Sequence, residues 1–240
     1  MSRRQLLLLE SFAYFLGGAL ATWLAVVVGI PLLARKWGIP PAVGWFLTSG
    51  ILVAVFFFVA IAAARRTTAS GSFAETTEAL RLRPLNRADL AWALGGLVGV
   101  VLLTGGVVTA FSGLFAINLL SKESYATFLQ MEALQPGQFW LLLAWLPYFF
   151  FNIAGEELLW RGYLLPRQAE AVGSRAWVLN GVLWAVFHAA IGWRIAVILI
   201  PIEFIVPYVV QKRQNTWLGV IIHGLYNGSG FILVAFGIVK

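Results

Sequence analysis

The sequence predicts an all-α fold, a polytopic bundle of about seven transmembrane helices with one short interfacial helix. Hydrophobic residues fill 60% of the 240 positions and charged residues only 11%, which lies far outside the composition of soluble domains. Apolar runs of about 20 residues, the length that a helix needs to cross a bilayer, follow one another along the chain. Short stretches rich in Pro, Gly, Arg and Lys separate these runs, as turns between spans do.

The first three spans are predicted to be plain apolar helices. The first is expected at residues 11–34, where the run is long enough to span and has no clear small-residue cleavage site, so we interpret it as a retained helix rather than a signal peptide. The second is expected at residues 43–64. The third begins after Asn86, which with Asp89 three positions later has the pattern of a helix N-cap, and it continues to about Leu119.

Two polar stretches are predicted to lie outside the bilayer core. Residues 65–87 form the long polar connection between the second and third spans. Residues 121–135 are mixed and moderately amphipathic, and Pro136-Gly137 follows them. This pattern predicts the short interfacial helix.

The last four spans are predicted in close succession. The fourth starts near Gln138 and runs to about Ala171 despite Pro147. The fifth, sixth and seventh are expected at about residues 175–191, 194–210 and 216–239. Turns at residues 173–174, 192–194 and 212–215 separate them.

Basic residues favour one end of the predicted bundle. With the N-terminus inside, the inner ends hold Arg3, Arg4, Arg65, Arg66, Arg81, Arg83, Arg87, Arg167, Arg175, Lys212 and Arg213, and the outer ends hold Arg35, Lys36, Lys122, Arg194 and Lys240. Because Lys and Arg concentrate on the cytoplasmic side of membrane proteins, we predict a cytoplasmic N-terminus and an external C-terminus. We expect an integral protein of a bacterial or archaeal plasma membrane.

Composition also excludes several kinds of function. The chain has no cysteine, which excludes disulfides, thiolate metal ligands and a cysteine nucleophile. The net charge of +7 comes from basic residues that stand singly or in pairs between apolar runs, as topology signals do, so no nucleic-acid partner is predicted. No internal repeat is visible, which disfavours an inverted-repeat transporter.

Ionisable residues inside the predicted spans are confined to the second half of the chain. The interiors of the fourth to seventh spans hold Glu156, Glu157, Arg161, His188, Glu203 and His223, whereas those of the first three hold none. Such groups cost from about 2.5 kcal/mol upward in a bilayer and mark functional sites. We therefore predict a single membrane domain, 1–240, with a scaffold in residues 1–120 and a catalytic half in residues 138–240.

The fourth span carries three charged residues close together. On a helix, Glu157 and Arg161 are four residues apart and share a face, whereas Glu156 points about 100° away from Glu157. We predict that Arg161 neutralises Glu157 and that Glu156 is left as a general base for water. The alternative is a carboxylate pair at a helix end, solvated at the interface, with an ordinary salt bridge to Arg161.

The only two histidines in the chain both fall within apolar spans. His223 and Asn227 are four residues apart, so both could donate to one oxygen, as suits an oxyanion that develops on a peptide carbonyl. Two structural alternatives remain open. His188 could simply pack in the core against Trp184 and Phe187, and the His223–Asn227 pair could hold two helices together.

Three further polar residues are expected to have structural roles. Glu203 lies between two prolines of the sixth span, and we expect a counter-ion for Arg161 or Arg194 rather than a catalytic group, although it could line the same cavity. Asn152 and Asn180 are expected to form hydrogen bonds between helices.

A metal site is the alternative to metal-free catalysis. Glu156, His188 and His223 could form a zinc site with an open position for water. The His-Glu-x-x-His motif of many zinc proteases is absent, however, and the three ligands would come from three helices. We expect no cofactor, with Glu156 and His188 activating water while His223 and Asn227 hold the oxyanion.

The motifs resemble those of the CAAX protease and bacteriocin-processing family of intramembrane endopeptidases, which includes type II CAAX prenyl proteases. The family signature is Glu-Glu-x-x-x-Arg, then Phe-x-x-x-His, then His-x-x-x-Asn, on successive transmembrane helices. Glu156, Glu157 and Arg161 match the first motif, and His223 with Asn227 match the third.

The second motif departs from this signature, because Trp184 stands where Phe is usual before His188. An aromatic ring is kept, so we expect an altered pocket shape and unchanged chemistry. The resemblance covers about residues 138–230. It implies peptide-bond hydrolysis near the cytoplasmic face, with a peptide or lipidated protein as substrate and the lipid bilayer as surroundings.

The resemblance leaves the type of protease and some other functions open. The family has been described both as metalloproteases and as glutamate-type proteases, and the residues here favour the second description. A non-catalytic membrane scaffold or bacteriocin self-immunity protein is one alternative function. A proton-coupled transporter that uses Glu156, Glu203 and the histidines as a relay is the other.

Overall fold

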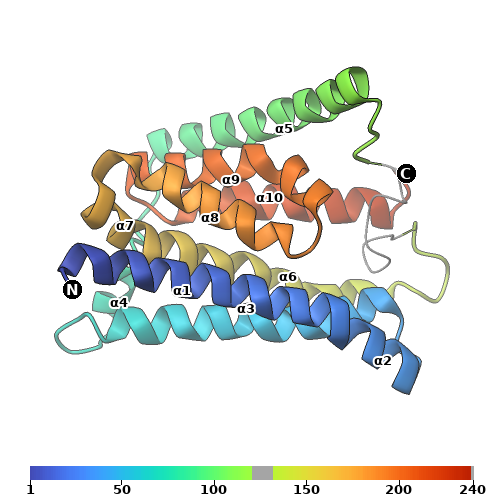
Figure 1. Cartoon of the computed structure of the whole chain (residues 1–240), viewed down its shortest axis with the longest axis horizontal. Coiled ribbons are helices and arrows are strands. Elements are labelled where there is room, and N and C mark those ends of the chain that lie inside the picture. The colour runs from blue at the N-terminus through green and yellow to red at the C-terminus, as the bar shows by residue number, and fades with distance from the viewer. Residues whose placement is uncertain (121–131, 239–240) are drawn as a thin grey trace.

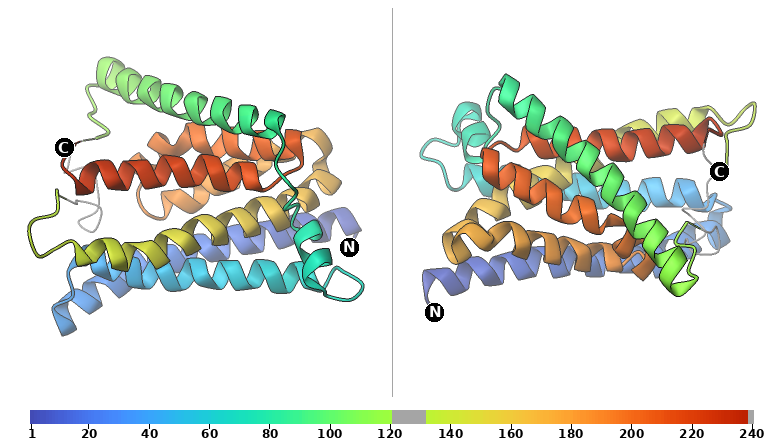
Figure 2. Two further views of the ribbon diagram at one scale, coloured as in Figure 1. Left: turned by 180° about the vertical axis from the view of Figure 1, so that it is seen from behind. Right: turned by 90° about the horizontal axis from the view of Figure 1, so that it is seen from above.

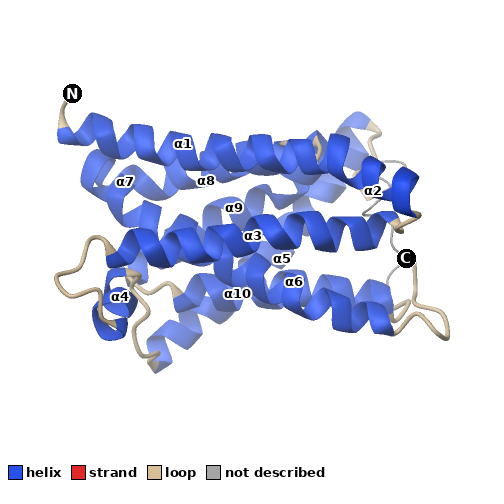
Figure 3. Cartoon of the chain, turned by 90° about the horizontal axis from the view of Figure 1, so that it is seen from below, coloured by secondary structure: helices blue, strands red, loops and turns tan. Residues whose placement is uncertain are grey.

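The chain folds into a bundle of helices (Figure 3). The structure is a computed structural model that describes residues 1–120 and 132–238, and these residues contain no strand. The predicted all-α class is confirmed.

The first half of the chain forms three long helical rods and one short helix. Their bounds are α1 (Arg3–Leu24), the π-helical turn η1 (Ala25–Gly29), α2 (Ile30–Trp37), α3 (Pro41–Arg65), α4 (Phe73–Ala79) and α5 (Arg87–Phe115). The turn η1 joins α1 to α2 without a break, so the predicted first span belongs to a longer helix.

The second half contains the helices with buried ionisable groups. Their bounds are α6 (Trp140–Glu156), the π-helical segment η4 (Glu157–Leu164), α7 (Leu165–Val172), the 3₁₀ turn η5 (Gly173–Arg175), α8 (Ala176–Ala189), α9 (Trp193–Arg213) and α10 (Trp217–Ala235). The helix continues through Pro147 and into η4 and α7, as predicted for the fourth span.

The predicted cap of α5 is confirmed. The Asn86 side chain accepts a hydrogen bond from the Asp89 backbone N–H at 2.9 Å, and the Asp89 carboxylate accepts one from the Asn86 backbone N–H at 3.1 Å. These reciprocal bonds satisfy N–H groups that a helix start would otherwise leave unpaired. Asp89 also pairs with Arg213 at 2.8 Å, which ties the start of α5 to the end of α9.

Of the two predictions for the connections, one needs correction and the other falls mostly outside the described residues. The polar stretch after α3 was predicted as a linker, but it contains α4, whose cap is Ser72 accepting from the Glu75 backbone N–H at 3.3 Å. The Ser-x-x-Glu spacing was the sequence signal for this helix. Most of the predicted interfacial helix, residues 121–131, lies outside the described residues, and residues 132–135 are not helical.

Five helical segments in the described part of the chain are long and apolar enough to cross a membrane. They are Arg3–Trp37, Pro41–Arg65, Arg87–Phe115, Trp193–Arg213 and Trp217–Ala235. The predicted fourth span corresponds to α6 with η4 and α7, and the fifth to α8 alone. The 14 residues of α8 extend about 21 Å, less than the hydrocarbon thickness of about 30 Å.

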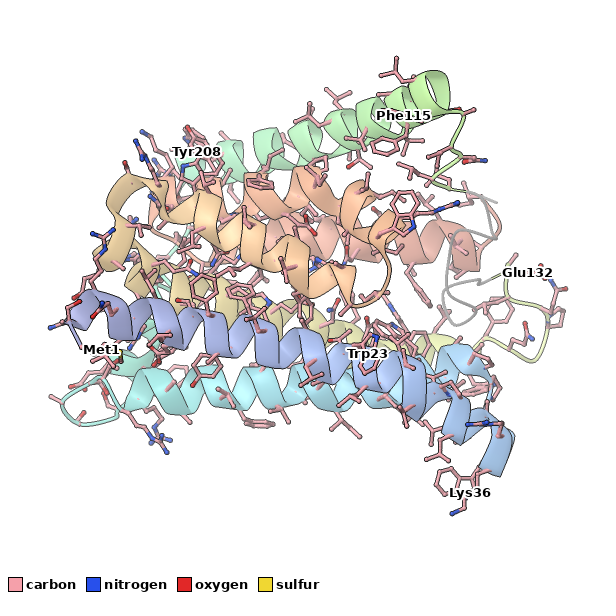
Figure 4. All side chains as sticks on the ribbon, in the orientation of Figure 1. Met1, Trp23, Lys36, Phe115, Glu132 and Tyr208 are labelled. Carbon is pink, nitrogen blue, oxygen red and sulfur yellow. The ribbon has the colours of Figure 1, made fainter. Side chains whose placement is uncertain are left out.

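The helices run side by side between two ends of the bundle. The N-terminus, α4 and α7 lie at one end, and α2 and the end of α10 lie at the other (Figure 1). Met1 and Lys36 mark these opposite ends (Figure 4). Helix α5 crosses α9 and α10 obliquely and packs against both (Figure 2).

An aromatic cluster fastens the two halves of the chain together. The fully buried Trp160 of η4 stacks on Phe15 of α1, with ring centroids 4.1 Å apart. Phe56 of α3 and Phe187 of α8 contact the same indole at 5.0 and 5.7 Å. Because buried aromatic rings contribute large apolar areas and oriented contacts, this cluster fixes η4 against three other helices.

Helices α3 and α6 approach each other most closely at Gly155. A Cβ atom at this position would overlap the carbonyl oxygen of Val53 and crowd the backbone nitrogen of Phe57. Only glycine therefore permits this separation of the two backbones.

We expect Gly155→Ala to destabilise the protein by about 1–3 kcal/mol or more, because backbone atoms of α3 would have to move. Thermal unfolding in detergent, followed by size-exclusion chromatography, measures the change. Gly105→Ala on α5 is the matched control, since its added Cβ meets no atom within 4 Å. An unchanged melting temperature for Gly155→Ala would contradict the close contact.

Candidate active site

The buried polar side chains of the second half are supplied by five adjoining segments. Glu156 ends α6, Glu157 and Arg161 lie in η4, Trp184 and His188 lie in α8, Glu203 lies in α9, and His223 and Asn227 lie in α10. Glu157, Arg161 and Glu203 are fully buried, and Glu156 and His223 are each 2% exposed. Charged groups buried this deeply require partners, and the hydrogen bonds show where they are.

The local backbone at the acidic pair is π-helical. All eight residues of η4 are buried, and α3, α9 and α10 pack against this segment. π-helical turns inserted into α-helices occur frequently at functional sites.

Glu156 is held by two uncharged donors. The Asn152 amide, one turn earlier in α6, donates to Oε1 at 2.7 Å, and the Trp184 indole N–H donates to Oε2 at 2.7 Å. Both oxygens are therefore fixed in place without a direct cationic partner. This arrangement keeps the carboxylate oriented while leaving it able to accept a proton.

Glu157 joins Arg161 and His223. Its Oε1 lies 3.2 Å from Nη1 of Arg161 and 2.9 Å from Nδ1 of His223. The predicted pairing of Glu157 with Arg161 is confirmed. Gly219 of α10 makes room for this carboxylate, because a Cβ there would overlap Glu157 Oε2.

Glu203 pairs with His188. Its Oε1 lies 3.0 Å from the imidazole Nδ1. We expected an arginine partner for Glu203, whereas the residue that pairs with it directly is His188. A carboxylate on Nδ1 fixes the ring and directs the other nitrogen, Nε2, as the atom for further contacts.

His223 and Asn227 contact each other. The Asn227 amide nitrogen lies 2.9 Å from His223 Nε2, and His223 Nδ1 faces Glu157. In a neutral imidazole that donates from Nδ1 to Glu157, Nε2 accepts from the Asn227 amide. The two predicted oxyanion donors are thus bonded to each other in this state, rather than both turned toward an external oxygen.

A cavity of about 250 Å³ brings the predicted groups together. Glu156, His188 and Asn227 line it, together with Asn152 and Tyr148. Helices α1 and α3 also contribute to the wall, so the predicted scaffold half shapes the cavity. Glu157, Arg161 and His223 do not line this cavity; all three are buried, and Glu157 contacts the other two.

The cavity extends toward the end of the bundle away from the N-terminus. Trp45 at the start of α3 and Ile191 and Ile195 around the start of α9 line it, and these segments lie toward that end (Figure 1). The basic helix ends lie at the other end, near the N-terminus. Which of these two ends faces the cytoplasm stays a prediction.

The donor atoms do not assemble as a three-ligand metal site. Among residues 1–120 and 132–238, no group of three or more His, Asp or Glu side chains has the arrangement to hold a metal ion. Glu156 accepts from Asn152 and Trp184, while the Nδ1 atoms of His188 and His223 face two different carboxylates. The choice between metal-free catalysis and a zinc site formed by Glu156, His188 and His223 therefore stays a prediction.

Sequence reasoning missed two residues that contact Glu156. Asn152 does bond between helices as predicted, since its Oδ1 accepts from the Asn227 amide of α10 at 3.4 Å. The missed contact is the one that its own amide donates along α6 to Glu156, for which the four-residue spacing was the available signal. Trp184 was expected to alter the pocket shape, but its indole N–H donates to Glu156. Asn180 does bond between helices as predicted, donating to the Trp160 carbonyl at 3.0 Å.

Comparison with known proteins gives an independent assignment. Residues 138–229 match the family model described as type II CAAX prenyl endopeptidase, Rce1-like. This segment contains the site from Asn152 to Asn227. No curated protein and no solved structure matches the chain. This match covers the segment that carries all three motifs and supports the resemblance to the CAAX protease and bacteriocin-processing family.

Proposed function

We propose that this membrane protein hydrolyses peptide bonds with a water molecule that Glu156 deprotonates. The observation that carries the proposal is the shared cavity, in which a buried carboxylate, an imidazole and an amide from three different helices face the same space. The family assignment supports an endopeptidase in general, and the roles of individual residues are our proposal.

Glu156 suits the role of general base. Its carboxylate is buried, is oriented through both oxygens by neutral donors, and lines the cavity. In the proposed step, Glu156 takes a proton from water while the water oxygen attacks the carbonyl carbon of the peptide. The carboxyl group then returns that proton to the leaving amine nitrogen as the C–N bond breaks.

His188 orients the same water. Because Nδ1 faces Glu203, Nε2 is the nitrogen that meets the cavity contents. A carboxylate behind the imidazole selects the tautomer and stabilises the protonated ring, as in hydrolytic triads. Glu203 therefore acts through His188 in this proposal rather than as an isolated counter-ion.

Asn227 supplies the oxyanion contact. A substrate carbonyl oxygen in the cavity would replace His223 Nε2 as the acceptor of the hydrogen bond that the Asn227 amide donates. A protonated His223 would add a second donor at Nε2, and Glu157 on Nδ1 would stabilise its charge. Arg161 in turn compensates Glu157.

The transporter alternative receives no support from the geometry. A proton relay needs ionisable groups at successive depths in the membrane. Glu156 and Glu203 instead both contact side chains of the same two turns of α8, Trp184 and His188. The proposed substrate is a peptide or prenylated protein segment in the membrane, as the family's description suggests.

We expect Glu156→Gln to lower kcat by about 10²–10⁴-fold, because the amide keeps the size of the side chain but cannot accept a proton from water. Purified protein in liposomes, assayed on a library that includes lipidated C-terminal peptides, measures this loss. Glu170→Gln is the control, since Glu170 is a partly exposed carboxylate that pairs with Arg3 far from the cavity. Equal cleavage by wild type and Glu156→Gln would contradict the general-base role.

Cleavage is expected to survive treatment with a metal chelator, because both oxygens of Glu156 accept hydrogen bonds from Asn152 and Trp184, and His223 Nε2 meets the Asn227 amide. The assay compares wild type before treatment, after dialysis against chelator, and after addition of Zn²⁺. Loss on dialysis with recovery on Zn²⁺ addition would establish a metalloprotease and assign ligand roles to the histidines.

We expect Asn227→Ala to lower kcat by about 10²–10³-fold, as the loss of one oxyanion donor does, with a much smaller effect on KM. Steady-state kinetics on the best library peptide separates the two parameters. Ser229→Ala, two residues later on α10, should retain wild-type kinetics because its hydroxyl bonds to the Tyr226 carbonyl. A rise in KM with unchanged kcat would mean that Asn227 binds the ground state only.

A further inference from the structure

Trp184 contacts four ionisable residues of the site. It is fully buried in α8, one turn before His188, and its indole N–H donates to Glu156 Oε2 at 2.7 Å. The guanidinium carbon of Arg161 lies 3.5 Å from its ring centroid. The rings of His188 and His223 lie 5.1 and 5.3 Å from the indole.

We propose that Trp184 is a positioning residue that fixes the Glu156 carboxylate for proton abstraction from water. This inference rests on the proposed function, since it assigns Trp184 a task in that reaction. Asn152 holds Oε1 and Trp184 holds Oε2, so the two donors together set the plane of the carboxylate. Removing either donor leaves one oxygen of a buried carboxylate unpaired and the group free to rotate.

The indole group also has a specific hydrogen-bonding chemistry. The indole N–H can donate a hydrogen bond but cannot accept one. It therefore stabilises the ionised carboxylate, which is the form that can take a proton from water. A phenylalanine at this position would retain a ring against Arg161 but would remove the donor. The departure of this chain from the Phe-x-x-x-His motif thus places a new hydrogen bond on the proposed base.

Several ionisable groups lie around Glu156. They are Tyr148 on α6, Glu157 and Arg161 on η4, His188 on α8, Glu203 on α9 and His223 on α10. All of them are retained when Trp184 becomes phenylalanine. A change in the pH dependence of cleavage between wild type and this variant then reports the lost indole donor.

The decisive variant is Trp184→Phe, compared with Trp160→Phe. Trp160 is equally buried in η4, but its indole N–H has no hydrogen-bond partner among the described residues, so the control removes the same atoms without touching Glu156. We expect Trp184→Phe to lower kcat at least about tenfold with KM nearly unchanged. The lower-pH limb of the kcat/KM profile should move to higher pH by about one unit, since the ionised base has lost a donor. Trp160→Phe should retain the wild-type profile.

A spectroscopic measurement tests the hydrogen bond without any substrate. The chain has 11 tryptophans, and the indole ¹H–¹⁵N signal of Trp184 is the one that disappears in Trp184→Phe. We expect that signal to move upfield in Glu156→Gln, because a bond to a charged acceptor becomes a bond to a neutral one. It should stay in place in Glu170→Gln.

The outcomes separate this inference from the proposed function. If wild type cleaves and Trp184→Phe has the same kcat and pH profile, the positioning role is overturned while the proposed function stands. A uniform fall in kcat with an unchanged pH profile, or an indole signal that does not respond to Glu156→Gln, also overturns it. A wild type that cleaves nothing in a broad library overturns the proposed function and the positioning role together.

Discussion

The structure depends on how three carboxylates are accommodated in the centre of an apolar bundle. Glu156, Glu157 and Glu203 are buried with one guanidinium, that of Arg161. An unpaired buried charge is costly, so each carboxylate must meet a donor from another turn or helix. Arg161 pairs with Glu157 only, so the other two carboxylates depend on hydrogen bonds from Asn152, Trp184 and His188. Residues of α6 and α8 that carry no fixed charge therefore hold two of the three carboxylates.

These contacts are possible because helices approach closely where glycines face them. Gly219 of α10 leaves the space that the Glu157 carboxylate occupies, and Gly155 allows α3 to lie against α6 beside Glu156. Gly181 likewise allows α8 to approach α9, because a Cβ at Gly181 would lie 2.8 Å from the Glu203 carbonyl oxygen. Small residues thus bring the polar groups within hydrogen-bond distance, whereas the aromatic cluster around Trp160 holds that arrangement in place.

The spacing of residues within one helix allowed part of this structure to be predicted from the sequence. The contacts between helices could not be predicted in this way. The cap formed by Asn86 and Asp89 and the pair of Glu157 with Arg161 depend on residues three and four positions apart, so their geometry follows from a single helix. The partner of Glu203 and the donor from Trp184 come from other helices, whose rotation and depth no local pattern specifies. Helix α4 was missed because a Ser/Thr/Gly-rich composition outweighed one capping signal.

The dimensions of the cavity constrain what the proposed enzyme can cut. A helix with side chains is about 10–12 Å across, so two of its turns need more space than this cavity of about 250 Å³ or the neighbouring one of about 570 Å³, which Asn152 and Asn227 also line. A peptide bond inside a transmembrane helix also has its N–H and C=O groups bonded within that helix. The scissile bond must therefore lie in an extended stretch that reaches Glu156, such as the end of a membrane-anchored chain. Substrate choice then depends on which chains present an unwound end at this depth in the bilayer, in addition to the side chains that they carry.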